Sequence, residues 1–173
     1  MSGARGRPEP ARRDPPRAHL PLLDRLIDEA PEREQDAPLS PAEAMAALRR
    51  SVRRDMEALL NARRRWRSCP RGLTELAVSP LNYGIPDCTG GAFQDVRERE
   101  ALRREIEDTV RRFEPRFQSV RVTLVEGRNK LEATLRLRIE ALLHAEPAPE
   151  PVTFDTVIDV TTADAVVRSH DDR

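Results

Sequence analysis

The hydrophobic positions of this chain follow helical spacing in its first half and strand spacing in its second half. From residue 40 onward, apolar side chains recur at steps of three and four, which is typical of a helix with one buried face. Ser40, Pro41 and Glu43 supply a capping box and a proline at the first helical position. The pattern predicts a helix from residue 40 to about residue 66. Its apolar stripe consists of Met45, Leu48, Val52, Met56 and Leu59.

A second helix is predicted from Asp95 to Phe113. Pro115 should end it, because the residue before a proline is pushed out of the helical region. The connection at 68–91 is long and rich in proline and glycine, which is unusual in a compact domain unless it is functional or well packed. Within it, a short ordered piece is expected around Leu73, Leu76 and Val78.

Strict alternation of apolar and polar residues then predicts three strands. Val120, Val122 and Leu124 lie in the first, and residues 131–140 form the second after a turn at 127–129. This alternation is typical of an antiparallel hairpin with one buried and one solvated face. The third strand is expected at 152–160, and the polar residues from Thr161 onward are expected to fray.

These elements predict an α+β fold in which two main helices pack on one face of a three-stranded antiparallel sheet. Both outer edges of such a sheet can pair with a strand from another chain. Residues 1–19 lack large apolar side chains and are expected to be disordered. We expect a short docking helix and linker at 20–39, the folded domain at 40–162 and a C-terminal tail at 163–173.

The short docking helix is an isolated group of leucines between polar, proline-containing segments. Leu22, Leu23 and Leu26 fall on one helical face together with Ile27. Such a face either packs back on its own domain or docks on a partner, and the pattern favours neither.

Charge is balanced overall but unevenly distributed. The 173 residues hold 30 basic and 30 acidic side chains, so no net charge attracts nucleic acid or an anionic membrane. Residues 45–71 carry nine arginines against two carboxylates, a net of +7, and residues 140–173 carry a net of −6. Complementary surfaces of this kind suit ordered assembly, although two solvated faces would look the same. The alternative is that the arginine-rich helix binds nucleic acid, with Trp66 as its one stacking residue.

The sequence indicates no enzyme, cofactor, metal site or small-molecule substrate. Cys69 and Cys88 have neither zinc-ligand spacing nor a histidine nearby, and read as reduced thiols. No nucleophile elbow or phosphate-binding loop occurs, and aromatic residues are only 3%, too few to line a sugar cleft. No apolar stretch reaches membrane-spanning length and no secretory signal is present, so we expect a cytoplasmic protein without membrane insertion.

Four stretches in order, supported by two strand segments, resemble the TssE family, the small baseplate wedge subunits of the bacterial type VI secretion system. The resemblance covers about residues 20–160 and is shared with the small wedge protein of contractile phage baseplates. Residues 135–141 and 149–156 are the supporting strands. The four stretches are 22–26, 51–61, 79–87 and 113–116.

The resemblance implies a structural protein beside the wedge subunits TssF, TssG and TssK. It also implies that the sheet accepts strands from the first sheath ring and so nucleates sheath assembly, linking wedge to sheath. The family's signature triplet corresponds here to Glu114, Pro115 and Arg116. We expect this rigid corner to grip helices of TssF and TssG, with an intramolecular clamp as the alternative.

We expect a second signature segment, 82–87, to have a structural role. Gly84 and Pro86 should impose a turn, and Tyr83 should anchor that turn in the core. Asn82 and Asp87 complete the segment.

Overall fold

The computed structural model describes residues 20–27, 31–32, 39–64, 72–87, 95–125, 134–146, 148–159 and 161–170. Several sequence-based expectations lie outside these residues. They are the disordered tail at 1–19, most of the linker, the hairpin turn at 127–129, and the roles of Trp66, Cys69 and Cys88.

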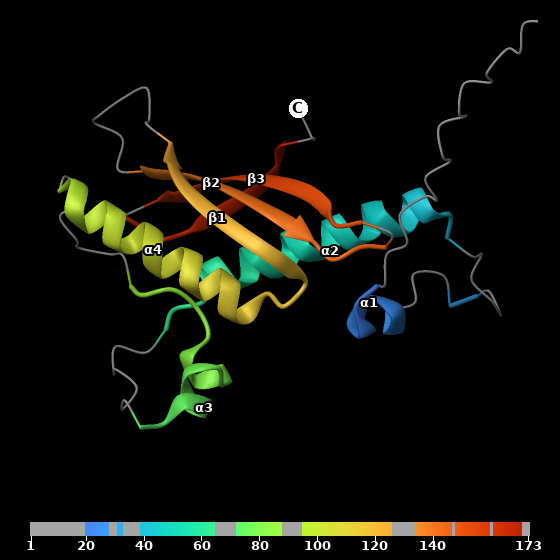
Figure 1. Cartoon of the computed structure of the whole chain (residues 1–173), viewed down its shortest axis with the longest axis horizontal. Coiled ribbons are helices and arrows are strands. Elements are labelled where there is room, and N and C mark those ends of the chain that lie inside the picture. Colours follow the sequence, from blue (N-terminus) through green and yellow to red (C-terminus); the bar gives the residue numbers. More distant parts are fainter. Residues whose placement is uncertain are drawn as a thin grey trace, which may run out of the picture.

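All described helices precede the described strands along the chain, an order typical of an α+β protein (Figure 1). The helical elements are α1 (Leu22–Leu26), α2 (Pro41–Asn61), α3 (Thr74–Ala77), the 3-10 turn η1 (Pro80–Asn82) and α4 (Val96–Phe113). The strands are β1 (Phe117–Val125), β2 (Thr134–Leu143), β3 (Glu150–Asp159) and β4 (Ala165–Ser169).

The predicted helix starts are confirmed by their hydrogen bonds. Ser40 accepts a hydrogen bond from the Glu43 amide at 3.3 Å, and the Glu43 carboxylate accepts one from the Ser40 amide at 2.8 Å. Asp95 begins α4 by accepting from the Arg97 amide at 2.8 Å. Both helices therefore start where the capping residues indicate.

The predicted end of α2 near residue 66 is wrong, because the helix stops at Asn61. Ala62 is extended, and its carbonyl accepts a hydrogen bond from the Ile85 amide at 3.0 Å. Arg64 in turn donates its amide to the Ile85 carbonyl at 2.9 Å. The chain after Asn61 thus pairs with a distant segment, and this pairing replaces further helix.

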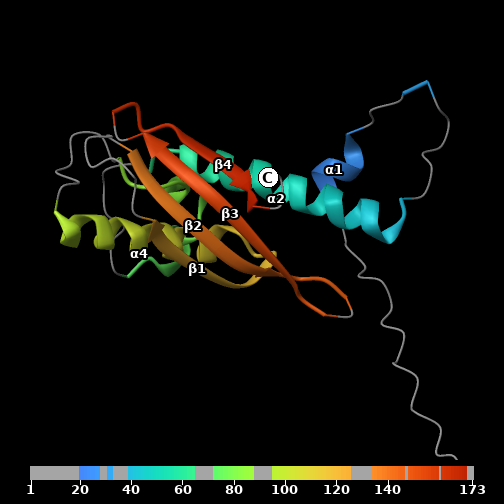
Figure 2. The same ribbon diagram turned by 90° about the horizontal axis from the view of Figure 1, so that it is seen from above.

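The sheet has four antiparallel strands in the order β1-β2-β3-β4, where three were predicted (Figure 2). The fourth strand, β4, lies in the region expected to be a frayed C-terminal tail. Its Ala165 and Val167 are buried while Val166 and Arg168 are exposed. An alternation of only five residues is too short to predict a strand from sequence. The segment becomes a strand because it pairs with β3.

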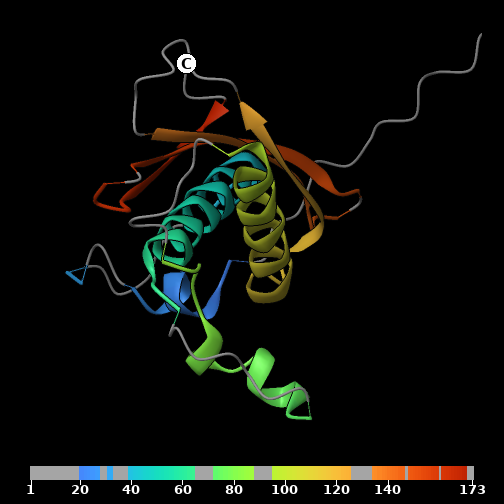
Figure 3. The same ribbon diagram turned by 90° about the vertical axis from the view of Figure 1, so that its left-hand side faces the viewer.

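Both long helices cover the same face of the sheet, as the end-on view shows (Figure 3). Their apolar stripes meet the inward side chains of all four strands in one core. Val52, Met56, Ile106 and Ile139 are completely buried there. None of the described helices lies over the opposite side of the sheet, which we call the open face (Figures 1 and 3).

Candidate functional site

At the predicted corner after α4, the side chains of Glu114 and Arg116 bond to each other. The Arg116 Nε donates to Glu114 Oε1 at 2.6 Å, and its Nη2 bonds to the second carboxylate oxygen. The Arg116 amide also donates to Glu114 Oε1 at 3.2 Å. A bidentate guanidinium–carboxylate pair fixes both side chains in one plane. Pro115 is exposed between them and fixes the direction in which the chain leaves the helix.

Arg116 also reaches across to helix α2. Its Nη2 lies 2.8 Å from Asp55 Oδ2, and its Nη1 lies 3.2 Å from the Ser51 hydroxyl. We call this group of Glu114, Arg116, Asp55 and Ser51 the Arg116 clamp. Since it joins the end of α4 and the start of β1 to the middle of α2, it matches the geometry of the intramolecular alternative.

The electrostatics of the Arg116 clamp favour its charged form. The Glu114 side chain is only 5% exposed and that of Arg116 is 23% exposed. Burial by itself would lower the pKa of Arg116, but the hydrogen bond and charge of Glu114, followed by those of Asp55, raise it. The guanidinium therefore balances a carboxylate that would otherwise be buried without a counter-charge. Contact of this corner with a partner protein stays a prediction.

A hollow of about 350 Å³ lies beside the corner. Tyr83 and Phe113 pack edge to face in its lining, with ring centres 5.4 Å apart. Burial raises the pKa of Tyr83, and the negative charges of Asp55 and Glu114 raise it further. The hollow thus combines apolar rings with a charged rim. Its remaining lining residues are Pro21, Leu59, Pro115 and Arg116.

The segment 82–87 lies beside the end of α2, and its predicted role as architecture stays a prediction. Asn82 is buried and donates its side-chain amide to the Ala77 carbonyl at 3.0 Å. Gly84 has a φ of +101°, and Ile85 follows it into the bridge with Arg63 beside the end of α2. Tyr83 packs against the core rather than inside it. Pro86 and Asp87 continue the segment and make contacts of their own.

The predicted docking helix α1 leaves its leucines in solvent. Leu22, Leu23 and Leu26 are 68%, 58% and 71% exposed. The helix is nevertheless tied to α2, because Arg54 Nη1 donates to Asp24 Oδ1 at 2.6 Å. In the isolated chain the leucine face is therefore presented outward and does not pack back on the domain. Whether a partner covers it stays a prediction.

Several arginines in α2 and directly after it are engaged by this chain's own carboxylates, whereas Arg50 is exposed. Arg54 pairs with Asp24 and Asp55, Arg49 with Glu150, and Arg64 with Glu105 at 2.7 Å. Each such pair would have to open before the guanidinium could contact a phosphate. This internal pairing speaks against the nucleic-acid alternative.

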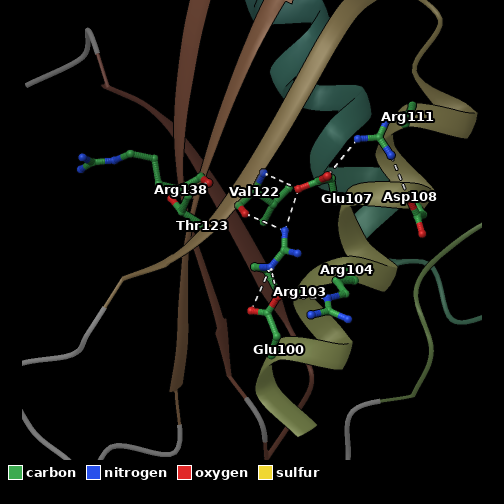
Figure 4. A network of polar contacts seen from close by, with 9 residues as sticks. All are labelled: Glu100, Arg103, Arg104, Glu107, Asp108, Arg111, Val122, Thr123 and Arg138. Carbon is green, nitrogen blue, oxygen red and sulfur yellow. Dashed lines mark hydrogen bonds and ion pairs between the residues drawn. The ribbon is translucent and has the colours of Figure 1, made fainter. Parts of the chain in front are cut away.

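The edge of the sheet at β1 is covered by a charged pair from α4 that the sequence analysis did not identify (Figure 4). Glu107 Oε2 accepts the Val122 amide at 3.0 Å, and Arg103 Nη1 donates to the Val122 carbonyl at 2.9 Å. Arg103 and Glu107 also bond to each other at 2.7 Å. We call this arrangement the Glu107–Arg103 clamp. The only sequence signal for the pair is that Arg103 and Glu107 lie four residues apart on one helix.

We predict that this clamp weakens at acid pH. Burial would raise the pKa of Glu107, but hydrogen bonds from Val122, Arg111 and Arg103 together lower it below its ordinary value of 4.5. The unfolded chain therefore takes up the proton at higher pH than the folded chain does. The stability that Glu107 contributes is present above pH 4.5 and is lost as the pH falls through the lowered folded pKa.

Urea denaturation at a series of pH values from about 7 to about 3 measures this dependence. Glu107→Gln is the matched control, since it retains the shape but cannot ionise. Its midpoint should fall less steeply with acid than that of the original protein. Parallel curves for the two proteins would show that Glu107 does not contribute.

Within the described ranges, no cluster of three or more histidine, cysteine, aspartate or glutamate side chains could hold a metal ion. Among the same residues, no helix is long and apolar enough to cross a membrane.

Comparison with known proteins gives one family. The family model GPW_gp25, described as "Baseplate wedge protein gp25", matches residues 46–148. This range is more than half of the chain and contains the corner at 114–116, all of α4, and strands β1 and β2. Neither the curated proteins nor the solved structures contain a significant match.

Proposed function

The chain belongs to the gp25 family of baseplate wedge proteins, and from this membership we propose that it is the TssE-type wedge subunit of a type VI secretion baseplate. The family is structural and non-enzymatic, and its members work beside other baseplate and sheath proteins of contractile-tail systems. In the proposed role the chain links the wedge to the contractile sheath and nucleates sheath assembly.

The observation that carries the proposal is the corner at 114–116, which lies within the matched range and is held by the pair of Glu114 and Arg116. Because Arg116 holds the corner from inside, partners would meet its outer parts, namely the exposed Pro115 and the hollow lined by Tyr83 and Phe113. Such a hollow can take an apolar side chain from a partner helix, and its charged rim can orient that helix. TssF and TssG are the proposed occupants, and TssK is the proposed neighbour.

The leucines of α1 extend this surface. Pro21, which directly precedes α1, lines the hollow, so α1 lies next to the corner. Three exposed leucines on one short helix are unusual for a surface that stays in water. We assign them to the contact with wedge proteins.

A pull-down with the tagged full-length chain from native cells tests the function. Wedge and sheath subunits should be the dominant partners if the proposal is right. Recovery of nucleic acid that is lost on raising the salt concentration, without those subunits, would instead favour the arginine-helix alternative.

A triple leucine variant tests the proposed contact through α1. We expect Leu22→Ser/Leu23→Ser/Leu26→Ser to leave the unfolding transition nearly unchanged, since exposed substitutions usually alter stability by less than about 0.5 kcal/mol. Recovery of the wedge subunits should fall at least several-fold in the same pull-down.

The matched control is Leu73→Ser/Val78→Ser/Leu81→Ser, which removes three other exposed apolar side chains around α3 and η1. It should retain the wedge subunits. Equal losses in both triple variants would remove α1 from the proposed contact.

A further inference from the structure

Helix α1 (Leu22–Leu26) cannot stay ordered by itself. It has five residues, and isolated helices of that length are unstable in water. Its N-cap residue, Pro21, makes no side-chain capping bond, and none of the residues of α1 is buried. The order of α1 must therefore come from contacts with the rest of the domain.

Asp24 provides such a contact from within α1. Among Leu22–Leu26, all of which the structure describes, only Asp24 is not exposed. Its Oδ1 accepts a hydrogen bond from Arg54 Nη1 at 2.6 Å, which holds α1 beside α2 (Figure 2). This hydrogen bond lowers the pKa of Asp24, so the side chain is a carboxylate at neutral pH. Leu20 and Pro21, just before the helix, add contacts with the core and with the hollow.

The contact continues from Arg54 into the Arg116 clamp. Arg54 Nε donates to Asp55 Oδ1 at 3.0 Å, and Arg116 Nη2 lies 2.8 Å from Asp55 Oδ2. Both guanidinium groups also donate to the Ser51 hydroxyl, with distances of 3.3 Å from Arg54 Nη2 and 3.2 Å from Arg116 Nη1. These contacts form a row of alternating charges, which we call the α1–corner chain. Its members are Asp24, Arg54, Asp55, Arg116 and Glu114.

The charge balance of the α1–corner chain separates the position of α1 from the stability of the fold. Without Asp24, the chain keeps two arginines and two carboxylates. Glu114, its most deeply buried member, keeps Arg116 as a partner. Arg54 keeps Asp55, and its side chain is 45% exposed, so water can replace the lost bond. Loss of Asp24 should therefore release α1 and leave the domain folded.

The position of α1 matters because it sets the shape of the exposed apolar surface. With α1 held through Asp24, its three exposed leucines lie beside the hollow that Pro21 lines. A partner helix with one apolar face can cover the leucines and the rings of Tyr83 and Phe113 together. When α1 is already ordered, binding does not have to supply the free energy that orders it.

We propose that Asp24 is a positioning residue that holds α1 beside the corner, so that the leucines and the hollow receive one amphipathic helix of a wedge subunit. It acts through Arg54, Asp55 and Ser51, which join α1 to the Arg116 clamp. This inference rests on the proposed function and specifies how its contact surface is ordered before binding.

Hydrogen exchange and affinity measurements on the full-length chain test the assignment. In Asp24→Ala, the amides of Arg25 and Ile27, which bond to carbonyls of α1 and its N-cap residue, should exchange several-fold faster. The urea midpoint should stay the same, and the affinity for the purified TssF–TssG pair should fall several-fold. Asp24→Glu, which retains the carboxylate, should recover most of that affinity.

Two controls separate positioning from direct contact. Arg25→Ala changes an exposed residue of the same helix that has no ion pair among the described residues. It should leave exchange in α1 and the affinity nearly unchanged. In the background of the triple leucine variant of α1, Asp24→Ala should cause no further loss of affinity, because no leucine face is left to position.

The results that would overturn the assignment differ from those that would overturn the proposed function. Unchanged exchange in α1 would show that Asp24 does not hold the helix, and a lowered urea midpoint would make Asp24 part of the fold. Faster exchange with unchanged affinity would leave the wedge contact standing without a role for Asp24. A further loss in the leucine background would assign Asp24 to direct contact. If the original chain does not bind the TssF–TssG pair, the proposed function fails and this inference with it, whatever the exchange rates are.

Discussion

Replacing Arg116 with alanine should lower the free energy of unfolding by about 3 kcal/mol, near the lower end of the effect of breaking a buried ion pair. The reason is the position of Glu114, whose side chain is 5% exposed and whose two oxygens both accept from Arg116. Without the guanidinium, that carboxylate stays buried without its counter-charge. Urea denaturation at neutral pH followed by circular dichroism measures the loss.

The variant should also lose its wedge partners, because the clamp sets the geometry of the corner. The double variant Arg116→Met/Glu114→Gln separates charge from shape: it removes both charges and should recover much of the stability. Arg112→Ala is the matched control, since Arg112 lies in the last turn of α4, is exposed and has no ion pair among the described residues. An Arg116→Ala protein as stable as the Arg112→Ala protein would show that the clamp is not structural.

Gly84→Ala is expected to destabilise the fold by about 3 kcal/mol, from backbone strain and overpacking together. Gly84 has a φ of +101°, which side-chain-bearing residues rarely adopt. A Cβ placed there would lie 2.4 Å from the carbonyl oxygen of Ala62. That same oxygen accepts the Ile85 amide, so the collision would disturb the pairing that ends α2. The midpoint of chemical denaturation measures the change.

Gly72→Ala is the internal comparison for this variant. A Cβ at Gly72 would meet nothing within 4 Å, and its φ is not in the positive range. We expect its stability to change by less than about 0.5 kcal/mol. Equal midpoints for the two variants would mean that the close approach at Gly84 is relieved by movement of the segment 82–87.

Only part of the corner at 114–116 could be predicted from the sequence. Glu114, Pro115 and Arg116 were identified by resemblance, and Pro115 ends α4 as its backbone chemistry requires. The partners of Arg116 on α2 were not identified. Asp55 lies 61 positions away and Ser51 65 positions away, and no local pattern links them to the corner.

The sheet edges show the same limit. The side-chain hydrogen bonds to the backbone of Val122 and Ala165 come from Glu107 with Arg103 and from Asn61, residues that look like ordinary polar positions on helices. Their roles depend on how each helix lies across the sheet. That placement follows from packing of the whole core and not from any one segment.

The amino-acid sequence by itself determined the α+β class, both helix starts and three of the four strands. These features depend on periodicity, capping and backbone restrictions, which act over a few residues. The tertiary structure alone decided the end of α2 at Asn61, the pairing of β4, the Arg116 clamp and the closure of each sheet edge. Each of these is a contact between distant segments, and its free energy is gained only when the core brings those segments together.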